Sequence, residues 1–343
     1  MRVHRYGPHL FHTNNAKVVE WLSAFGTFVP YEHKVEAVLP DNRRVPLPVN
    51  RRTINTVFGL KLANEHEVRA FLQTQAVPIE QPANAAEHLI ANIGKTLTDL
   101  FFRPYTRKMW ALDLEDLDAA VVKRIPIRHD DEDRYFPADR YQMLPRDGYT
   151  AIFERILDHP GIRVTLGERF DRAMLRSYAH CFNSMPIDEY FDDAFGPLPY
   201  RSIRFHHEDV PATQGHRAAT VNYTDSGKFT RETDWSRLPG HVVQPGPSIT
   251  LTREEPCDYV DNAMERYYPV KTSDGRYDAA YRKYAALADN DDKVSFIGRC
   301  GTYQYLDMHQ VINQSLQNVR SWISHQAKPA SHLQVPGSSL QSV

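Results

Sequence analysis

The hydrophobic pattern of this chain changes its period along the sequence, and that change limits the folds open to it. In residues 33–48 apolar and polar residues alternate around a Pro-Asp-Asn turn, which predicts a β-hairpin. In residues 53–121 apolar residues recur at helical spacing, with prolines between the helices. In residues 181–297 short β-type runs alternate with Gly, Pro and Asn. The sequence therefore predicts an α/β (mixed α+β) fold, with a helical bundle inserted beside a mainly antiparallel sheet.

Further helices and a strand are predicted outside these segments. Asn14 is expected to cap a helix that continues through Trp21, because its side chain can accept a hydrogen bond from the first turn. Residues 149–157 and 308–324 also carry an apolar face at helical spacing. A strand is expected at residues 162–166, directly after a Pro-Gly turn.

Two segments are expected to lie outside the packed core. Residues 123–133 hold Lys, Arg, Arg and His and then four consecutive acidic residues, without an apolar period. Such a charge run predicts an exposed, mobile loop. The tail at residues 326–343 is rich in Ser, Pro and Gln and is expected to be disordered.

The overall charge argues against a general nucleic-acid-binding protein. Lysine and arginine total 41 against 43 aspartates and glutamates, so the net charge is −2 rather than strongly positive. No apolar run approaches the roughly 18 residues that span a membrane, and the N-terminus lacks the apolar stretch of a signal peptide. The three cysteines are scattered and odd in number, which argues against a disulfide framework or a zinc site. A soluble, cytoplasmic protein is expected.

Common catalytic motifs are mostly absent. The sequence has no Walker A motif, no G-x-S-x-G and no G-x-G, so the dinucleotide fingerprint is missing. His9 and His12 are spaced like a metal-binding pair, but no carboxylate or cysteine lies at ligand spacing, so no metal is expected. Asp116 and Asp118 form the D-x-D sequence of some UDP-sugar glycosyltransferases, yet they read better as a helix N-terminus.

Tyrosine and arginine are the residue types that indicate a ligand. Eighteen tyrosines are present, and several stand beside an arginine. Arginine binds a diphosphate through bidentate hydrogen bonds, and tyrosine hydroxyls add neutral donors. Arg124, Arg231 and Arg299 lie in distant segments and would have to converge on such a ligand, which their spacing alone does not establish.

Four aromatic residues are also grouped closely in the sequence. Phe101, Phe102, Tyr105 and Trp110 fall within ten residues, at near-helical spacing. Aromatic faces can stack on a nucleobase. The same spacing is also typical of an apolar stripe in a protein core, so both interpretations remain open at this point.

Eight motifs, in this order, resemble those of the UDP-galactopyranose mutase family of flavoenzymes and extend over nearly the whole chain. They are YGPHLFHT (6–13), FFRPYTRKMW (101–110), KRIPIR (123–128) followed by Tyr135-Phe136, PIDEYF (186–191), YRS (200–202), FTR (229–231), YYP (267–269) and GRCGTYQYLDM (298–308). No single motif decides the matter, but their common order is specific.

The resemblance implies an isomerase that interconverts UDP-galactopyranose and UDP-galactofuranose, for galactofuranose and cell-surface polysaccharide biosynthesis. In that family a reduced FAD attacks the anomeric carbon through its N5, and the sugar opens and recloses as a flavin adduct. The implied partners are the substrate UDP-galactose and, as a further expectation, a second copy in a homodimer; no nucleic acid is expected.

The resemblance also assigns residues to roles. By this match, the catalytic residues on the diphosphate are Arg124, in a mobile substrate loop, and Arg231. The substrate-binding residues are Phe101, Phe102, Tyr105, Thr106, Trp110, Tyr135, Asn222, Tyr268 and Tyr305. The cofactor-binding residues are His12, Arg299 and Asp307.

The sequence also departs from the family pattern. The family has roughly fifty residues before the histidine loop, carrying the G-x-G-x-x-G turn that binds FAD, and the sequence given starts at that loop. Some family glycines are replaced, among them at Ala111. Weak or absent FAD binding is therefore expected, and a non-catalytic UDP-sugar-binding protein of the same family is the alternative function.

The expected domain organisation follows from the same match. Residues 1–25, 148–180 and 290–325 would form an incomplete, Rossmann-like FAD-binding domain. Residues 51–122 would form the helical subdomain. Residues 26–50, 123–147 and 181–289 would form the antiparallel substrate domain, and residues 326–343 the tail.

Overall fold

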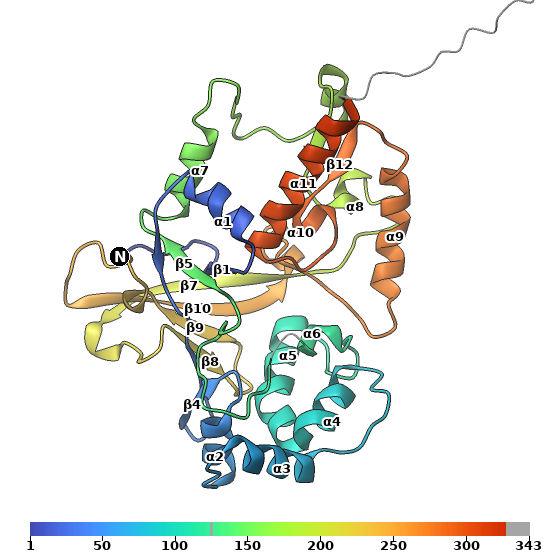
Figure 1. The fold of residues 1–343 in the computed structure, drawn as a ribbon. Coiled ribbons are helices and arrows are strands. Elements are labelled where there is room, and N and C mark those ends of the chain that lie inside the picture. Colours follow the sequence, from blue (N-terminus) through green and yellow to red (C-terminus); the bar gives the residue numbers. More distant parts are fainter. Residues whose placement is uncertain (124–125, 327–343) are drawn as a thin grey trace, which may run out of the picture.

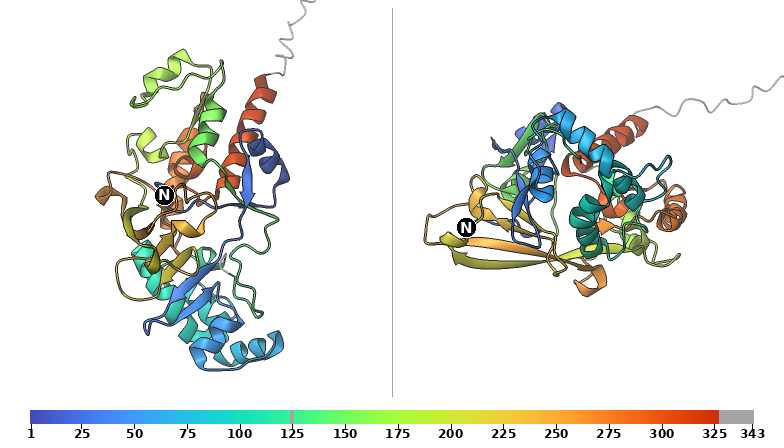
Figure 2. Two further views of the ribbon diagram at one scale, coloured as in Figure 1. Left: turned by 90° about the vertical axis from the view of Figure 1, so that its left-hand side faces the viewer. Right: turned by 90° about the horizontal axis from the view of Figure 1, so that it is seen from below.

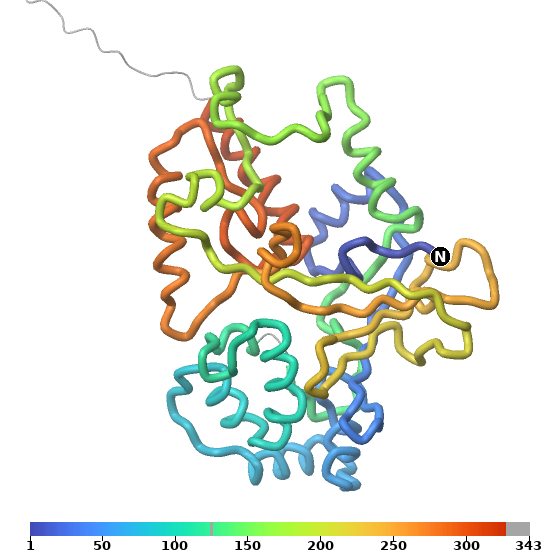
Figure 3. Tube along the Cα trace, turned by 180° about the vertical axis from the view of Figure 1, so that it is seen from behind, coloured from blue at the N-terminus to red at the C-terminus, as the bar shows by residue number. Residues whose placement is uncertain are grey.

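The computed structural model describes residues 1–123 and 126–326. A seven-stranded sheet crosses the middle of the molecule, with a group of helices on one side and a mixed α/β part on the other (Figure 1). The side and rear views keep the same arrangement of these three parts (Figures 2 and 3). The predicted mixed α/β fold class is confirmed.

The large sheet is mainly antiparallel, as the sequence predicts. Its strands lie in the order β11 (Tyr268–Pro269), β7 (Tyr200–Pro211), β10 (Ser248–Asp258), β9 (Arg231–Asp234), β8 (Thr220–Tyr223), β3 (Val35–Val38) and β4 (Arg44–Leu47). Strands β3 and β4 form the predicted hairpin, and β3 pairs with β8 in parallel. Strands β7 and β10 form the longest antiparallel pair of the sheet.

The helical group contains α2 (Arg51–Phe58), α3 (Glu65–Gln75), α4 (Ala85–Leu97), a π-helical turn (Thr98–Phe102), α5 (Arg103–Trp110) and the short α6 (Ala120–Lys123). The first three helices each begin after an asparagine whose side-chain oxygen accepts a backbone N–H of the first turn; these are Asn50, Asn64 and Asn84. Their apolar faces meet in one buried cluster that includes Ile54, Val68 and Ile93. The helices predicted in this segment are therefore present, while the helical subdomain at residues 51–122 stays a prediction as a domain.

Two small sheets and the remaining helices form the third part. One sheet joins β1 (Phe11–Thr13), β5 (Tyr141–Pro145) and β2 (Phe28–Pro30), and the other is a parallel pair of β12 (Val294–Phe296) and β6 (Cys181–Asn183). The helices are α1 (Ala16–Ser23), α7 (Tyr149–Leu157), α8 (Ile187–Tyr190), α9 (Arg276–Ala288), α10 (Gly298–Gly301) and α11 (Met308–Gln326). The predicted helices at 149–157 and 308–324 are thus confirmed.

Strands β2 and β5 differ from the expected organisation. They fall in segments assigned to the antiparallel substrate domain, but β5 pairs with β1 and with β2, and neither strand pairs with the large sheet. The physical reason is backbone pairing: β5 pairs with β1 on one side and β2 on the other, while β3 and β4 pair within the large sheet. The division into domains itself stays a prediction.

Three local expectations are wrong. The cap of α1 is Asn15 and not Asn14, whose side chain instead bonds to Asp139. Residues 162–166 form no strand; Leu166 is 87% exposed, and this segment has no neighbouring strand to complete a ladder. Within the expected exposed loop, Arg128 is buried because its guanidinium donates to three backbone carbonyls.

Candidate active site

A cavity of about 780 Å³ lies where the large sheet, the helical group and the start of α11 meet. All of the predicted site residues within the described part of the chain line it: His12, Phe101, Phe102, Tyr105, Thr106, Trp110, Tyr135, Asn222, Arg231, Tyr268, Arg299, Tyr305 and Asp307. Arg124, the other predicted catalytic residue, lies outside the described residues. Segments far apart in the sequence are therefore brought to one place.

One row of the large sheet forms part of the cavity wall. Its pairing places Asn222 opposite Arg231, Arg231 opposite Glu254, and Glu254 opposite Phe205. Residues directly opposite each other in adjacent strands point to the same face. All four line the cavity, so strand register alone sets their order across its wall.

Arg231 is held by partners on both sides. Its Nη2 donates to the hydroxyl of Tyr105 at 2.8 Å, and its Nε lies 3.4 Å from a carboxylate oxygen of Glu254. Burial raises the pKa of Glu254, and the positive charge of Arg231 opposes this rise. The pair places a positive side chain, with a matching carboxylate, inside an enclosed site. Glu254 was missed in the sequence because nothing in its spacing links it to Arg231.

Further tyrosines line the cavity together with Arg231. The rings of Tyr268 and Tyr305 stack with centroids 5.0 Å apart, and Trp110 meets Tyr268 edge-on. Burial raises the pKa of Tyr268 and also that of Tyr105. These two phenols therefore stay neutral near pH 7 and keep a proton to donate.

Arg299 lies at the base of the tyrosine stack. Its guanidinium carbon is 4.7 Å from the ring centroid of Tyr305 and 5.5 Å from that of Tyr268. Its Nε donates to the backbone carbonyl of Leu306 at 2.6 Å, which fixes the side chain beside the start of α11. The charge and the aromatic faces stabilise each other.

His12 forms a second polar centre in the lining of the cavity. Its Nδ1 lies 2.7 Å from a carboxylate oxygen of Asp139. Its ring stacks on that of Phe136, with the two ring centroids 3.6 Å apart. Asn14 donates to the other oxygen of Asp139 at 3.0 Å. The carboxylate therefore orients the imidazole, while the Phe136 ring fixes its plane. Asp139 was not predicted, since it lies 127 residues from His12.

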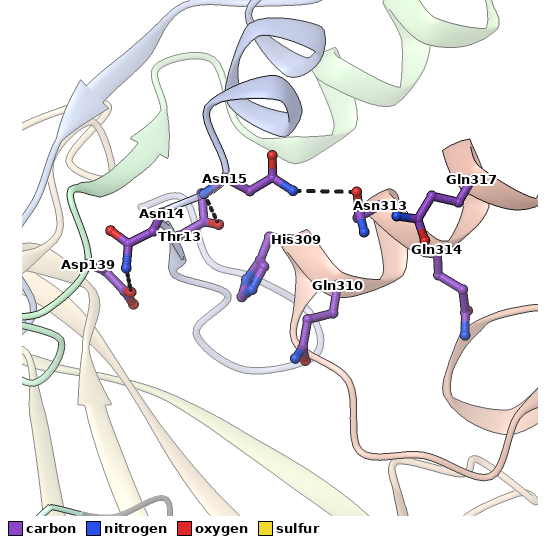
Figure 4. Close-up of a pocket in the computed structure, with 9 residues that line it drawn as sticks. All are labelled: Thr13, Asn14, Asn15, Asp139, His309, Gln310, Asn313, Gln314 and Gln317. Carbon is purple, nitrogen blue, oxygen red and sulfur yellow. Dashed lines mark hydrogen bonds between the residues drawn. The ribbon is translucent and has the colours of Figure 1, made fainter. Parts of the chain in front are cut away.

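A polar groove of about 430 Å³ adjoins this part of the cavity. Figure 4 shows the side chains that line it, which come from the end of β1, the start of α1, the segment before β5 and one face of α11. They are Thr13, Asn14, Asn15, Asp139, His309, Gln310, Asn313, Gln314 and Gln317. His309 lines both the groove and the cavity, and its Nδ1 is buried without a partner. Hydroxyls and amides of this kind suit a polar, hydrogen-bonding ligand.

In residues 1–123 and 126–326, no group of three or more His, Cys, Asp or Glu side chains could hold a metal ion. None of the helices in these residues combines the length and the apolar character needed to cross a bilayer.

Comparison with known proteins identifies the family. A sequence model of the family described as UDP-galactopyranose mutase matches residues 100–305, more than half of the chain. The chain belongs to the UDP-galactopyranose mutase family. This confirms the family and the isomerase class inferred from the ordered motifs, and the family is flavin-dependent.

Curated relatives extend the similarity over almost the whole chain. A dTDP-fucopyranose mutase of Escherichia coli is 32% identical over 335 residues, covering 95% of this chain and 86% of the relative. A UDP-galactopyranose mutase of Mycoplasma pneumoniae is 29% identical over 332 residues, covering 91% and 82%. Mutases with two different nucleotide sugars in their names are therefore similar to this member of the family.

Solved structures agree with the fold. A crystal structure of reduced UDP-galactopyranose mutase matches with a TM-score of 0.72 at 15% identity, covering 94% of this chain and 85% of that one. A putrescine oxidase variant matches with a TM-score of 0.51 at 13% identity, covering 93% and 88%. This member of the mutase family therefore shares its overall fold with a solved protein outside the family as well.

Proposed function

We propose that this chain interconverts UDP-galactopyranose and UDP-galactofuranose, with the substrate bound in the cavity beside Arg231. The observation that carries the proposal is the convergence of the described candidate residues on that one cavity. Family membership and the relatives that carry this activity in their names support it. None of the comparisons favours the non-catalytic alternative.

Arg231 is the proposed anchor of the diphosphate. A guanidinium binds phosphate oxygens through paired, charge-assisted hydrogen bonds. Tyr135, Tyr268 and Tyr305 line the same part of the cavity and would donate their hydroxyls to the remaining phosphate oxygens. Arg124 keeps its proposed role as the second arginine, on the strength of its place in the sequence motif alone.

The uridine would lie against α5 and the π-helical turn before it. Phe101, Phe102, Tyr105, Thr106 and Trp110 all line the cavity from these two elements. Aromatic faces at this end can stack on a base, which contributes roughly 1–3 kcal/mol per base. Asn222, in the row beside Arg231, would contact the sugar-phosphate end of the substrate.

The flavin would bind at the end of the cavity that contains His12. The donors present suit a planar polar ring: the oriented imidazole of His12, the guanidinium of Arg299, and the unpartnered Nδ1 of His309. When bound, a reduced flavin supplies the nucleophile for the anomeric carbon. His12, Arg299 and Asp307 would hold and orient it, and the large sheet would keep bulk water from the reacting end.

Three finer points belong to the same proposal. FAD is the form of flavin proposed, as in the family. A cytoplasmic location is proposed on the basis of family membership. A homodimer is retained as a prediction.

A second substrate deserves a direct comparison, because a relative named dTDP-fucopyranose mutase is 32% identical over most of the chain. The test supplies FAD, a chemical reductant and either UDP-galactofuranose or dTDP-fucofuranose, and follows the pyranose product by chromatography. We expect turnover of the UDP sugar with a higher kcat/KM. Preferential turnover of the dTDP sugar would replace the proposed substrate, and binding of either nucleotide without turnover would favour the non-catalytic alternative.

A further inference from the structure

Lys108 lies in the last turn of the short helix α5, and its side chain is unusually buried for a lysine. Its side chain on α5 is only 9% exposed. Its Nζ donates to the backbone carbonyls of Phe229 at 2.8 Å and Tyr223 at 2.9 Å, and to a carboxylate oxygen of Asp225 at 3.2 Å. An ammonium group has three donors, so its hydrogen-bonding capacity is fully used.

The three acceptors belong to the turn that connects β8 to β9. Tyr223 is the last residue of β8, and Phe229 lies two residues before Arg231, the first residue of β9. The ammonium therefore bridges the two arms of one turn. Removing it would leave two carbonyls without this partner, and carbonyls buried without a partner are costly. This cost ties the conformation of the turn to Lys108.

Helix α5 also contacts the first residue of β9, directly after the turn. Tyr105 precedes Lys108 by three residues, so the two side chains lie on neighbouring parts of one helical face. The hydroxyl of Tyr105 accepts from Arg231 at 2.8 Å. Both ends of the short segment from Phe229 to Arg231 are thus bonded to one helix. The bond from Lys108 to the Phe229 carbonyl and the bond from Arg231 to Tyr105 together fix the guanidinium relative to α5.

We propose that Lys108 is a positioning residue for diphosphate binding, which holds the β8–β9 turn against α5 so that Arg231 stays in place in the cavity. This inference rests on the proposed function. Lys108 does not line the cavity. Its effect on binding is therefore transmitted through Arg231.

The main test is Lys108→Met, which keeps much of the apolar stem and removes the ammonium. UDP binding to the full chain is measured by titration calorimetry, with thermal unfolding recorded for each variant. We expect the Kd for UDP to rise about tenfold, because Arg231 loses a fixed position for its charged hydrogen bonds. The matched control is Lys228→Met on the same turn. The Lys228 side chain is 59% exposed and pairs with Glu255, so its loss should change the Kd less than about twofold.

A double-mutant cycle separates positioning from general stability. If Lys108 acts through the contact between Tyr105 and Arg231, then Tyr105→Phe already removes part of the contribution of Lys108 to UDP affinity. Lys108→Met should then weaken UDP binding by only about threefold in the Tyr105→Phe background. Full additivity of the two effects, or an unchanged Kd in folded Lys108→Met, would overturn the inference.

A second variant keeps the test decisive if Lys108→Met does not fold. Asp225→Asn keeps the turn and removes one charged acceptor, and we expect it to weaken UDP binding about threefold. An unchanged Kd for this folded variant would then overturn the inference. If the unchanged chain binds neither UDP nor dTDP, the proposed function fails and the inference fails with it; if it binds UDP but the Lys108 and Asp225 variants bind equally well, only the inference fails.

Discussion

Asp139 Oδ2 lies 2.7 Å from Nδ1 of His12, although 127 residues separate them. The two meet because β1 and β5 pair antiparallel, which brings the segment before Tyr141 alongside Thr13. The second oxygen of Asp139 is occupied by Asn14. The carboxylate is thus fixed on both oxygens and determines which nitrogen of His12 holds the proton.

The first prediction concerns this pair. Asp139→Asn keeps the shape of the side chain but can present an N–H to His12, which favours the other tautomer of the imidazole. We expect kcat/KM for the mutase reaction to fall by at least about tenfold, in line with the contribution of an oriented histidine. The Kd for UDP should be unchanged, because His12 does not contact Arg231. Asp147→Asn, at an exposed aspartate paired with Arg155, is the control and should leave both quantities unchanged. Equal activity of the two variants would exclude a role for the pair.

The second prediction tests Arg231 itself. Arg231→Lys keeps the positive charge but loses the planar fork and the hydrogen bond to Tyr105. Since hydrogen bonds to charged groups contribute roughly 1.5–3 kcal/mol, UDP affinity should fall about tenfold to a hundredfold. The measurement is titration calorimetry. Arg253→Lys offers a matched control, because Arg253 lies next to Glu254 on β10 but points to the opposite face and pairs with Glu208. If both variants bind UDP like the unchanged chain, Arg231 does not bind the diphosphate.

The third prediction is a loss of stability in mild acid. Burial, with a smaller contribution from the charges of nearby His241, His9 and Arg2, lowers the pKa of His4 to about 3. The unfolded chain, with a histidine pKa of about 6.5, therefore binds more protons than the folded chain between these values. Stability must fall as the pH drops from 7 toward 4, by up to about 1.4 kcal/mol per pH unit for one such group.

The measurement is the free energy of urea unfolding at pH 7, 6 and 5. His4→Gln should flatten this dependence, because the neutral amide carries no titrating proton. Other buried histidines still contribute a slope, notably His33, whose pKa burial also lowers to about 3. His159→Gln removes an exposed histidine and should leave the slope as it is. Identical slopes for all three proteins would contradict the assignment to His4.

The sequence was sufficient where a local pattern determines a local structure. The hairpin of β3 and β4, the inserted helices and helix α7 were predicted from periodicity and turn residues, because these elements are held by contacts close in sequence. The ordered motifs also led to the residues that line the cavity. Ala111, predicted to replace a family glycine, has a φ of 54° at the end of α5, a conformation that glycine adopts more easily.

The rest depended on long-range packing that no local pattern encodes. Glu254 faces Arg231 only because β9 and β10 pair in one register. Asp139 reaches His12 only through the pairing of β1 with β5. The segment at 162–166 has the composition of a strand, but a strand also needs a partner to pair with, and its sequence does not specify one. Local preference was therefore a poor guide wherever the outcome depended on a distant strand.

The last prediction compares two glycines in the helical subdomain. Gly94 has a φ of +74°, and a Cβ there would lie 2.4 Å from the backbone oxygen of Gln75 at the end of α3. Gly59 has a similar φ of +66°, but a Cβ there would meet nothing within 4 Å. Gly59→Ala should therefore cost only the conformational strain, about 1 kcal/mol. Gly94→Ala must also push α3 away from α4 and should cost about 3 kcal/mol or more, measured as the free energy of urea unfolding. Similar losses in the two variants would mean that α3 moves easily, and that the close approach at Gly94 is not what sets the packing of these helices.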